Sequence, residues 1–303
     1  MCGHCGCGGE AGATVLNLET GKVTGMRRGV DDHPHDHERP HSHDHPRDHE
    51  HAHDHGQSHS HGHGHAHDDA HHHHSHASAN GALVELETRI LAKNDALAEK
   101  NRAWFRGREI LALNLVSSPG AGKTSLLERT IRDLSRELRI YVIEGDQATA
   151  VDGERIRAAG APAVQVNTGS GCHLEADMVA RGLQELRPSA GSVVMIENVG
   201  NLVCPALFDL GERAKVVILS VTEGDDKPLK YPHMFRAAGL MILNKIDLMP
   251  HVDFDVSRAI ANAAQVNPAI TTLQLSARTG EGLEGWYAWL RREAAAVKDA
   301  VFT

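Results

Sequence analysis

The segment 111–127, LALNLVSSPGAGKTSLL, constrains this chain more than any other stretch. An apolar run rich in Leu and Val enters a turn of Ser, Pro and Gly, and a helical pattern begins near Lys123. A strand, a small-residue turn and a helix form a phosphate-binding loop, in which backbone N–H groups and the helix N-terminus surround an anion. The general motif has glycine where this chain has Ser117, and a plain turn before a helix is the competing interpretation. The context favours a nucleotide-binding domain.

The phosphate loop gives individual residues expected roles. Lys123 would reach the β- and γ-phosphates, and the Thr124 hydroxyl would ligate Mg²⁺. The other residues expected to contact the nucleotide here are Gly120, Ala121, Gly122 and Ser125. Apolar runs alternate with helical patterns after the loop, which predicts an α/β fold of the P-loop NTPase type, with a mostly parallel central sheet flanked by helices.

The chain ahead of this domain has an unusual composition. Of the 24 histidines, 20 lie in residues 31–76, where apolar residues are almost absent. So little apolar surface cannot offset the entropy cost of ordering, so we expect residues 31–80 to be disordered when metal-free. The predicted organisation is a Cys-rich segment over residues 1–30, this histidine tract, and a P-loop domain over residues 81–303.

The histidine tract alternates His with Asp, Ser, Gly and Ala. Imidazole suits Ni²⁺, Zn²⁺ and Cu²⁺, and interleaved carboxylates favour cations, so the tract should bind several ions. A cloning tag and a solubilising, pH-sensitive tail are the competing interpretations. Because ligation requires neutral imidazole, metal uptake should weaken as the pH falls through about 6.5. The expected ligands include His43, His45, His61, His63, His65 and His67.

Three thiols, Cys2, Cys5 and Cys7, lie at the start of the chain with glycines among them. Glycine lets the backbone fold several thiolates around one ion, and soft thiolates suit nickel or zinc. A redox pair and an unstructured terminus are the alternatives. No signal peptide or membrane-spanning apolar run is seen, which predicts a cytoplasmic protein with reduced thiols. The net charge of −9 and the lack of Lys/Arg clusters argue against nucleic-acid binding.

Carboxylates follow two of the later predicted strands. Asp146 comes after the strand 139–143, where it could hold Mg²⁺ through water, orient the attacking water, or cap a helix over 147–159. Glu197 and Gly200 follow the strand 192–196 with the spacing of a DxxG motif, which supplies a carboxylate for Mg²⁺ and an N–H for the γ-phosphate. The predicted catalytic residues are Lys123, Asp146 and Glu197.

Cys172, His173 and Cys204 also follow predicted strands, on the side expected to bind the nucleotide. Adjacent Cys and His supply sulfur and nitrogen ligands, and Cys204 would complete an open metal site. A buried, inert cysteine is the usual alternative for a lone thiol. Two thiols on neighbouring loops, one of them beside a histidine, favour metal binding.

An NKxD motif, formed by Asn244, Lys245 and Asp247, follows a strand about 120 residues after the phosphate loop. The Asp carboxylate can accept from both guanine N1–H and N2–H₂, a pair of donors that adenine lacks. Asn244 would position the loop and contact the base edge, while the Lys245 stem packs over the ring. Ser276 and Ala277 begin a loop whose N–H groups could meet guanine O6. The sequence therefore predicts a GTP site.

Amphipathic patterns lie on either side of these motifs. Residues 82–106 predict one or two helices with an apolar face formed by Leu83, Leu86, Ile90, Leu97 and the Trp104-Phe105 pair. Residues 283–297 predict a final helix whose tryptophans pack in the core. Core packing is the favoured role for both, and partner binding is the alternative for the first.

These motifs resemble those of the nickel-incorporation GTPases of hydrogenase maturation, which are dimer-forming P-loop GTPases of the SIMIBI class. The resemblance covers nearly the whole chain, and Ser117 fits because that family tolerates serine there. The motifs are CxxCGC at the start, the His-rich insert, SPGAGKT, EGD, the CH pair at 172–173, ENVGNLVCP and NKID.

The resemblance implies a slow, Mg²⁺-dependent GTPase in which GTP binding drives dimerisation across the nucleotide face. It also implies that Cys172, His173 and Cys204 form a shared Ni²⁺ or Zn²⁺ site at the interface, and that the N-terminal thiols form a separate, tighter nickel site. The histidine tract would be a nickel reserve. A HypA-type metallochaperone and the NiFe hydrogenase large-subunit precursor are the expected partners. The resemblance also implies that Lys227 and Lys230 lie near the GTP or GDP, either in their own chain or across the dimer.

Two other functions stay open. A related nickel GTPase that serves urease would share the same core, although the N-terminal thiol motif argues against it. The protein could also be chiefly a nickel store whose GTPase activity is secondary, because the histidine tract is so long.

Overall fold

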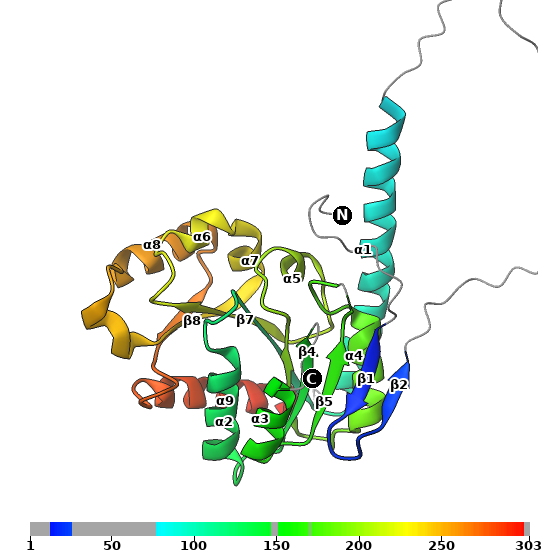
Figure 1. Ribbon diagram of the computed structural model, residues 1–303, viewed down its shortest axis with the longest axis horizontal. Coiled ribbons are helices and arrows are strands. Elements are labelled where there is room, and N and C mark those ends of the chain that lie inside the picture. Colours follow the sequence, from blue (N-terminus) through cyan, green and yellow to red (C-terminus); the bar gives the residue numbers. More distant parts are fainter. Residues whose placement is uncertain (1–12, 26–76, 147–150, 170, 300–303) are drawn as a thin grey trace, which may run out of the picture. The chain divides into compact units, whose positions relative to one another are not determined.

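The computed structural model describes residues 13–25, 77–146, 151–169 and 171–299. Nine strands in these residues form one sheet, in the order β2-β1-β5-β4-β6-β3-β7-β8-β9 (Figure 1). Strands β3 to β9 pair in parallel, whereas β1 runs antiparallel to both β2 and β5. The strands are β1 (Thr14–Asn17), β2 (Val23–Gly25), β3 (Leu111–Ser117), β4 (Ile140–Asp146), β5 (Ala163–Asn167), β6 (Val193–Glu197), β7 (Ala214–Ser220), β8 (Ala238–Asn244) and β9 (Thr271–Gln274).

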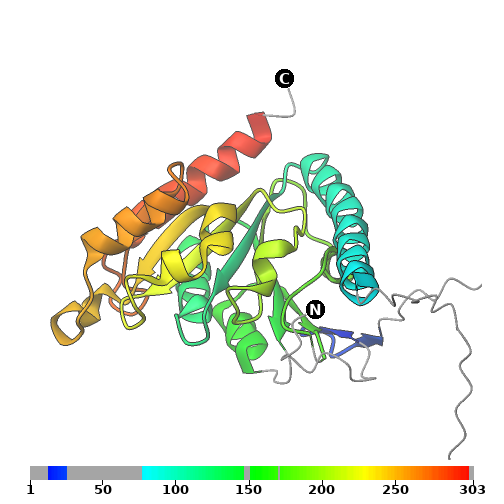
Figure 2. The same cartoon turned by 90° about the horizontal axis from the view of Figure 1, so that it is seen from above.

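Helices cover both faces of the sheet (Figure 2), because the side chains of the central strand β3 alternate between two apolar layers. Leu111, Leu113 and Leu115 pack with α2, α3 and α9, whereas Ala112 faces α1 and α4. Helices α7 and α8 cover the second face beside β7 and β8. The helices are α1 (Ala77–Arg106), α2 (Lys123–Leu134), α3 (Val151–Ala159), α4 (Ala176–Leu186), α5 (Cys204–Leu207), α6 (Lys227–Lys230), α7 (Pro232–Ala237), the 3₁₀ helix η1 (Ile246–His251), α8 (Val256–Val266) and α9 (Leu283–Asp299). The predicted α/β fold with a mostly parallel sheet is confirmed.

The domain boundary expected at residue 81 leaves out part of the sheet. The hairpin β1–β2 lies ahead of it in sequence, yet β1 pairs along its whole length with β5. The described residues 13–25 therefore group with the P-loop domain. Strands of four and three residues are too short to give a periodic signal, which is why the sequence did not indicate them.

Helix α1 is one continuous helix, and its buried face differs from the expected apolar face. Phe105 is buried as expected, but Ile90 is exposed, and Asn94 and Asn101 are buried in addition. The two asparagines are buried because they satisfy the backbone at the start of α4. Asn94 Oδ1 accepts from the Ala176 N–H at 2.9 Å, and Asn101 Nδ2 donates to the Ala176 carbonyl at 2.8 Å. Hydrogen bonds therefore decide which face of α1 packs against α4. Such bonds do not recur at a fixed spacing along the sequence, so the apolar pattern did not predict this face.

The carboxyl ends of the parallel strands meet at one edge of the sheet, and most of them carry polar residues. In open parallel sheets this edge is where ligands bind. The residues at these ends include Ser117, Asp146, Asn167, Glu197, Ser220 and Asn244.

Candidate functional site

The phosphate loop joins β3 to α2 and adopts backbone angles that favour glycine. Gly120 and Gly122 have φ of 75° and 97°, and a Cβ on Gly122 would lie 2.5 Å from Nδ2 of Asn244. Lys123, only 8% exposed, donates from Nζ to the Ser117 hydroxyl at 3.0 Å. Ser117, the departure from the general motif, therefore supplies an oxygen that holds the lysine in place.

Two buried carboxylates lie near Lys123. Glu144 and Glu197 are partners across the parallel strands β4 and β6, and the Thr124 hydroxyl donates to Oε1 of Glu197 at 2.7 Å. Burial lowers the pKa of Lys123, although the Glu197 charge opposes that shift. Burial, followed by the charges of Glu197 and Asp146, raises the pKa of Glu144 to about 9, and burial also raises the pKa of Glu197.

The second oxygen of each of these two glutamates, Oε2, is buried and has no hydrogen-bond partner among the described residues. A buried acceptor without a donor is costly. Carboxylate oxygens beside the Thr124 hydroxyl form the oxygen-rich environment that a partly hydrated Mg²⁺ prefers, so these residues fit the ion. Glu144 was not among the residues predicted for this site; its adjacency to Glu197 in the sheet register is what reveals it.

We expect Glu144→Gln to stabilise the nucleotide-free protein at alkaline pH. The raised pKa of about 9, against 4.5 for an ordinary glutamate, means that the contribution of Glu144 to stability is fully present below pH 4.5. That contribution is lost as the pH rises toward 9, so the substitution should raise the free energy of unfolding by about 1–3 kcal/mol near pH 8. Thermal unfolding at about pH 5 and about pH 8 measures the effect. The exposed Glu154→Gln on α3 is the control, and equal pH dependence in both variants would contradict the expectation.

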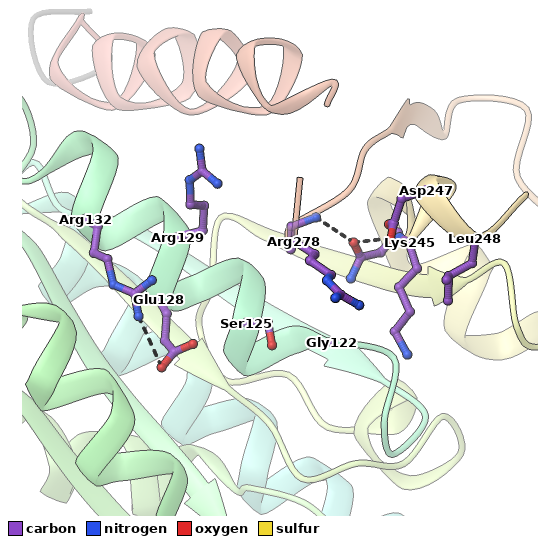
Figure 3. A pocket seen from close by; sticks show the side chains of 11 residues that line it. Gly122, Ser125, Glu128, Arg129, Arg132, Lys245, Asp247, Leu248 and Arg278 are labelled. Carbon is purple, nitrogen blue, oxygen red and sulfur yellow. Dashed lines mark hydrogen bonds and ion pairs between the residues drawn. The ribbon is translucent and has the colours of Figure 1, made fainter. Parts of the chain in front are cut away.

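A cavity of about 490 Å³ lies beside the phosphate loop, between α2 and the NKxD loop (Figure 3). Asp247 lines it, and its buried Oδ1 has no hydrogen-bond partner among the residues that the structure describes. A ligand that brings N–H donors would satisfy this oxygen. Lys245 has a φ of 66°, and its Nζ donates to the Gly120 carbonyl at 2.7 Å. Its stem thus connects the NKxD loop to the phosphate loop.

Asn244 ties together the three loops around this cavity. Its Nδ2 donates to the Ala121 carbonyl at 2.9 Å, and its Oδ1 accepts from the N–H groups of Lys245 and Ala277 at 2.8 and 3.1 Å. The Ser276 N–H donates to a carbonyl of its own loop at 2.8 Å. The N–H groups of Ser276 and Ala277, which we expected to meet guanine O6, are thus already engaged within the protein.

Two further neighbours reach the phosphate loop from other segments. Gly200 packs closely against it, because a Cβ there would lie 3.1 Å from Pro119 Cγ. Lys227, at the start of α6, donates from Nζ to the Ser118 hydroxyl at 3.1 Å. Lys230 pairs instead with an aspartate of its own segment at 2.7 Å. Lys227 therefore approaches the phosphate loop of its own chain.

Cys172, His173 and Cys204 come together in one cluster. Their ligand atoms lie within 4.8 Å of one another, with the two Sγ atoms 2.9 Å apart and Cys172 Sγ 3.7 Å from His173 Nδ1. Burial lowers the pKa of His173 to about 4, so its imidazole is neutral and able to ligate at neutral pH. Two thiols and an imidazole are suited to Ni²⁺ or Zn²⁺ and leave a coordination position open.

Several predicted residues lie outside the described residues. Residues 147–150 are among them, so the alternative roles of Asp146 stay predictions. None of the described helices is long and apolar enough to cross a membrane. The predicted metal ligands outside the described residues are Cys2, Cys5, Cys7, His43, His45, His61, His63, His65 and His67.

Comparison with known proteins gives consistent matches. The nucleotide-binding domain of the CobW/HypB/UreG family matches residues 111–274. The hydrogenase maturation factor HypB of Rhizobium leguminosarum bv. viciae is 60% identical over 222 residues, which cover 73% of this chain and 74% of the relative. HypB of Escherichia coli (strain K12) is 54% identical over 223 residues, covering 74% of this chain and 77% of the relative.

Two crystal structures are also similar to this chain. HypB from Archaeoglobus fulgidus has a TM-score of 0.63 and 41% identity, covering 67% of this chain and 99% of that one. HypB from Helicobacter pylori in complex with nickel has a TM-score of 0.63 and 37% identity, covering 67% of this chain and 96% of that one. The family match spans the phosphate loop, the Cys172–Cys204 cluster and the NKxD loop. On these grounds the chain belongs to the HypB hydrogenase maturation factors, within the CobW/HypB/UreG nucleotide-binding family.

Proposed function

We propose that this protein hydrolyses GTP in a Mg²⁺-dependent reaction and uses its nucleotide state to control nickel transfer during maturation of a NiFe hydrogenase. The observation that carries this proposal is the short distance in sequence between the two sites. Glu197, which binds the Thr124 hydroxyl, and Cys204, which belongs to the metal cluster, lie in one segment after β6. A backbone movement at Glu197 would therefore be transmitted to the metal ligand Cys204.

The nucleotide is GTP in this proposal because Asp247 presents a buried, unpartnered acceptor to the base cavity. Guanine brings two N–H donors to such a group, whereas adenine would leave it unsatisfied. Lys123 would stabilise charge on the phosphates, and Thr124 and Glu197 would hold Mg²⁺. When bound, Mg²⁺ neutralises charge that develops between the β- and γ-phosphates. Asp146, at the end of β4, would orient the attacking water.

Nickel is the transferred metal in this proposal, because the donor set suits it and a similar HypB was crystallised with nickel. Zn²⁺ is the competing ion. Val203 and Leu207, on either side of Cys204, are exposed apolar residues, which supports GTP-dependent dimerisation over this face. A HypA-type metallochaperone and the hydrogenase large-subunit precursor would receive the metal. The cytoplasm is the proposed location, since ligation needs reduced thiols.

Nickel transfer from the loaded protein to a chelator tests the proposal, with GTP, GDP or no nucleotide present. A variant lacking residues 31–76 runs in parallel, so that ions bound by the histidine tract do not mask the rest. We expect the release rate to depend on the nucleotide, by about fivefold or more, in the variant without the tract, and by less in the full-length protein, where tract-bound ions add to the release. A rate that ignores the nucleotide in both proteins would overturn nucleotide control of transfer.

A nickel store is the second candidate function, and the 20 histidines of residues 31–76 favour it. The same deletion separates the two functions in cells. If storage is the main role, the deletion removes nickel retention and its phenotype. If nickel insertion is the main role, hydrogenase activity persists when nickel is plentiful.

A further inference from the structure

Asn201 connects the two segments that carry the metal ligands. Its Nδ2 donates to the Cys172 carbonyl at 3.4 Å, and its Oδ1 accepts from the Val203 N–H at 2.8 Å. Val203 directly precedes Cys204. One amide side chain therefore holds the backbone beside each of the two cysteines.

Asn198 holds the other side of the Cys172-His173 pair. It is only 2% exposed, and its Oδ1 accepts from the Leu174 N–H at 3.2 Å and from the Val199 N–H at 3.0 Å. Leu174 follows His173 in sequence. The Cys172-His173 pair is thus fixed at its first carbonyl by Asn201 and at the next N–H by Asn198.

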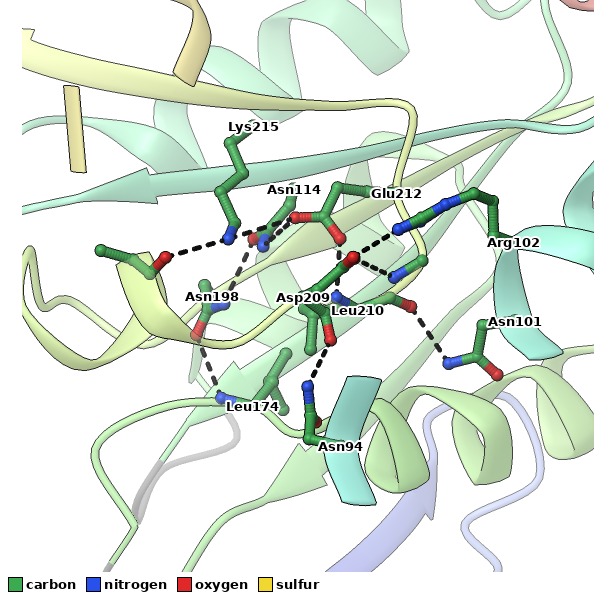
Figure 4. Close-up of polar contacts among 12 residues, drawn as sticks. Asn94, Asn101, Arg102, Asn114, Leu174, Asn198, Asp209, Leu210, Glu212 and Lys215 are labelled. Atoms are coloured by element: carbon green, nitrogen blue, oxygen red, sulfur yellow. Dashed lines mark hydrogen bonds and ion pairs between the residues drawn. The ribbon is translucent and has the colours of Figure 1, made fainter. Parts of the chain in front are cut away.

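A buried polar network also holds the Asn198 side chain through its Nδ2 group (Figure 4). Asn198 Nδ2 donates to Oδ1 of Asn114 at 3.2 Å, and Asn114 Nδ2 donates to Oε1 of Glu212 at 3.1 Å. The Lys215 ammonium lies 3.7 Å from Glu212 and donates to the Ala206 carbonyl, in the helix that begins at Cys204, at 3.4 Å. Asn114 is a buried amide in the middle of β3, which is costly unless it is hydrogen-bonded. The network therefore restricts how the segments that carry the metal ligands can move.

The segment 197–201 also contacts the nucleotide site at two points. Glu197 accepts from the Thr124 hydroxyl, and Gly200 packs against Pro119 of the phosphate loop, as described above. Gly200 lies between Asn198 and Asn201. A γ-phosphate that displaced the close Gly200–Pro119 contact would shift the backbone from which both asparagine side chains project, and Mg²⁺ held by Glu197 would act on the first residue of the same segment.

We propose that Asn198 and Asn201 are positioning residues that transmit the nucleotide state to the Cys172-His173 metal loop. This inference rests on the proposed function and names the hydrogen bonds through which it works. In one nucleotide state the asparagines hold the two cysteines together, and in the other they let the Cys172-His173 backbone shift away from Cys204. The described hydrogen bonds of both asparagines are to protein groups, and neither residue belongs to the Cys172, His173 and Cys204 cluster.

The test uses the full chain with Cys2→Ser, Cys5→Ser and Cys7→Ser, because Cys172 and Cys204 are then its only thiols. Thiolate-to-nickel charge-transfer absorption then reports this site and not the histidine tract. Nickel is titrated from a chelate buffer with Mg²⁺ and either GDP or a non-hydrolysable GTP analogue. The variant is Asn201→Ala, and the matched control is Asn262→Ala on α8, which removes a 3.0 Å hydrogen bond from an amide side chain to the Asp225 carbonyl.

The parent protein is the chain with only the three Cys→Ser substitutions. In it we expect the half-saturating nickel concentration to differ about tenfold between GDP and the GTP analogue. Asn201→Ala should bring that ratio close to one while a fluorescent GDP analogue still binds normally, and Asn262→Ala should keep the ratio. If Asn201→Ala keeps the same ratio of half-saturating nickel concentrations as the parent protein, this inference is wrong and the proposed function is unaffected. A ratio of one in the parent protein overturns both.

Discussion

Lys123→Ala is expected to reduce GTP hydrolysis by at least about a hundredfold. The Lys123 ammonium is buried in the phosphate loop and held by Ser117, so it already occupies the place where phosphate charge must be stabilised. Alanine leaves the carboxylates Glu144 and Glu197 without their nearby cation, so GTP affinity should fall as well. Phosphate release and equilibrium binding of GTP measure the two effects.

The same variant should load nickel on residues 31–76 as fully as the unaltered protein, because that tract is a separate unit of the chain. Lys93→Ala, at an exposed position on α1, is the control for the loss of one positive charge. Simultaneous loss of hydrolysis and of tract loading in Lys123→Ala would contradict the separation of the two modules.

Asp247→Asn should weaken GTP binding by about a hundredfold or more, because a polar site built for two donors is left mismatched. The amide offers one acceptor and one donor group, whereas guanine presents N1–H and N2–H₂ to this edge. Xanthine has a carbonyl in place of the guanine amino group, so xanthosine triphosphate should gain affinity in the variant. Competition binding with GTP, xanthosine triphosphate and ATP reports the change.

The exposed Asp253→Asn, six residues further along the chain, is the control for this substitution. An unchanged preference for GTP in Asp247→Asn would mean that another group reads the base. The N–H groups of Ser276 and Ala277 are engaged within the protein, so neither offers a free donor to guanine as the loop is arranged.

The parallel part of the fold could be predicted from the sequence because its strands are continuous apolar runs that end in polar motifs. Each run in the P-loop domain ends near the expected residue, so Lys123, Glu197 and Asp247 were placed at the correct sheet edge. The cluster of Cys172, His173 and Cys204 was also predicted, since each residue follows a strand that ends at this edge.

What the sequence could not indicate depends on hydrogen bonds between distant residues. Asn94 and Asn101 make the buried face of α1 look polar, and Asn114 interrupts an apolar strand, although each is satisfied by a partner far along the chain. The sequence does not show whether an asparagine side chain caps a turn or hydrogen-bonds to a distant loop. Asn198 and Asn201 therefore look like ordinary loop residues until their partners are known.

The hairpin β1–β2 changes how the histidine tract is attached to the protein. Because β1 pairs with β5, the histidine tract lies in the sequence between two elements of the described structure, β2 and α1, and is not a tail ahead of the first strand. The entropy cost of closing a flexible loop grows only with the logarithm of its length, about 0.6 kcal/mol for each doubling. If the segment is disordered, as its composition predicts, its length can change at little cost to the stability of the P-loop domain, and the metal capacity proposed for it can change independently of the nucleotide site.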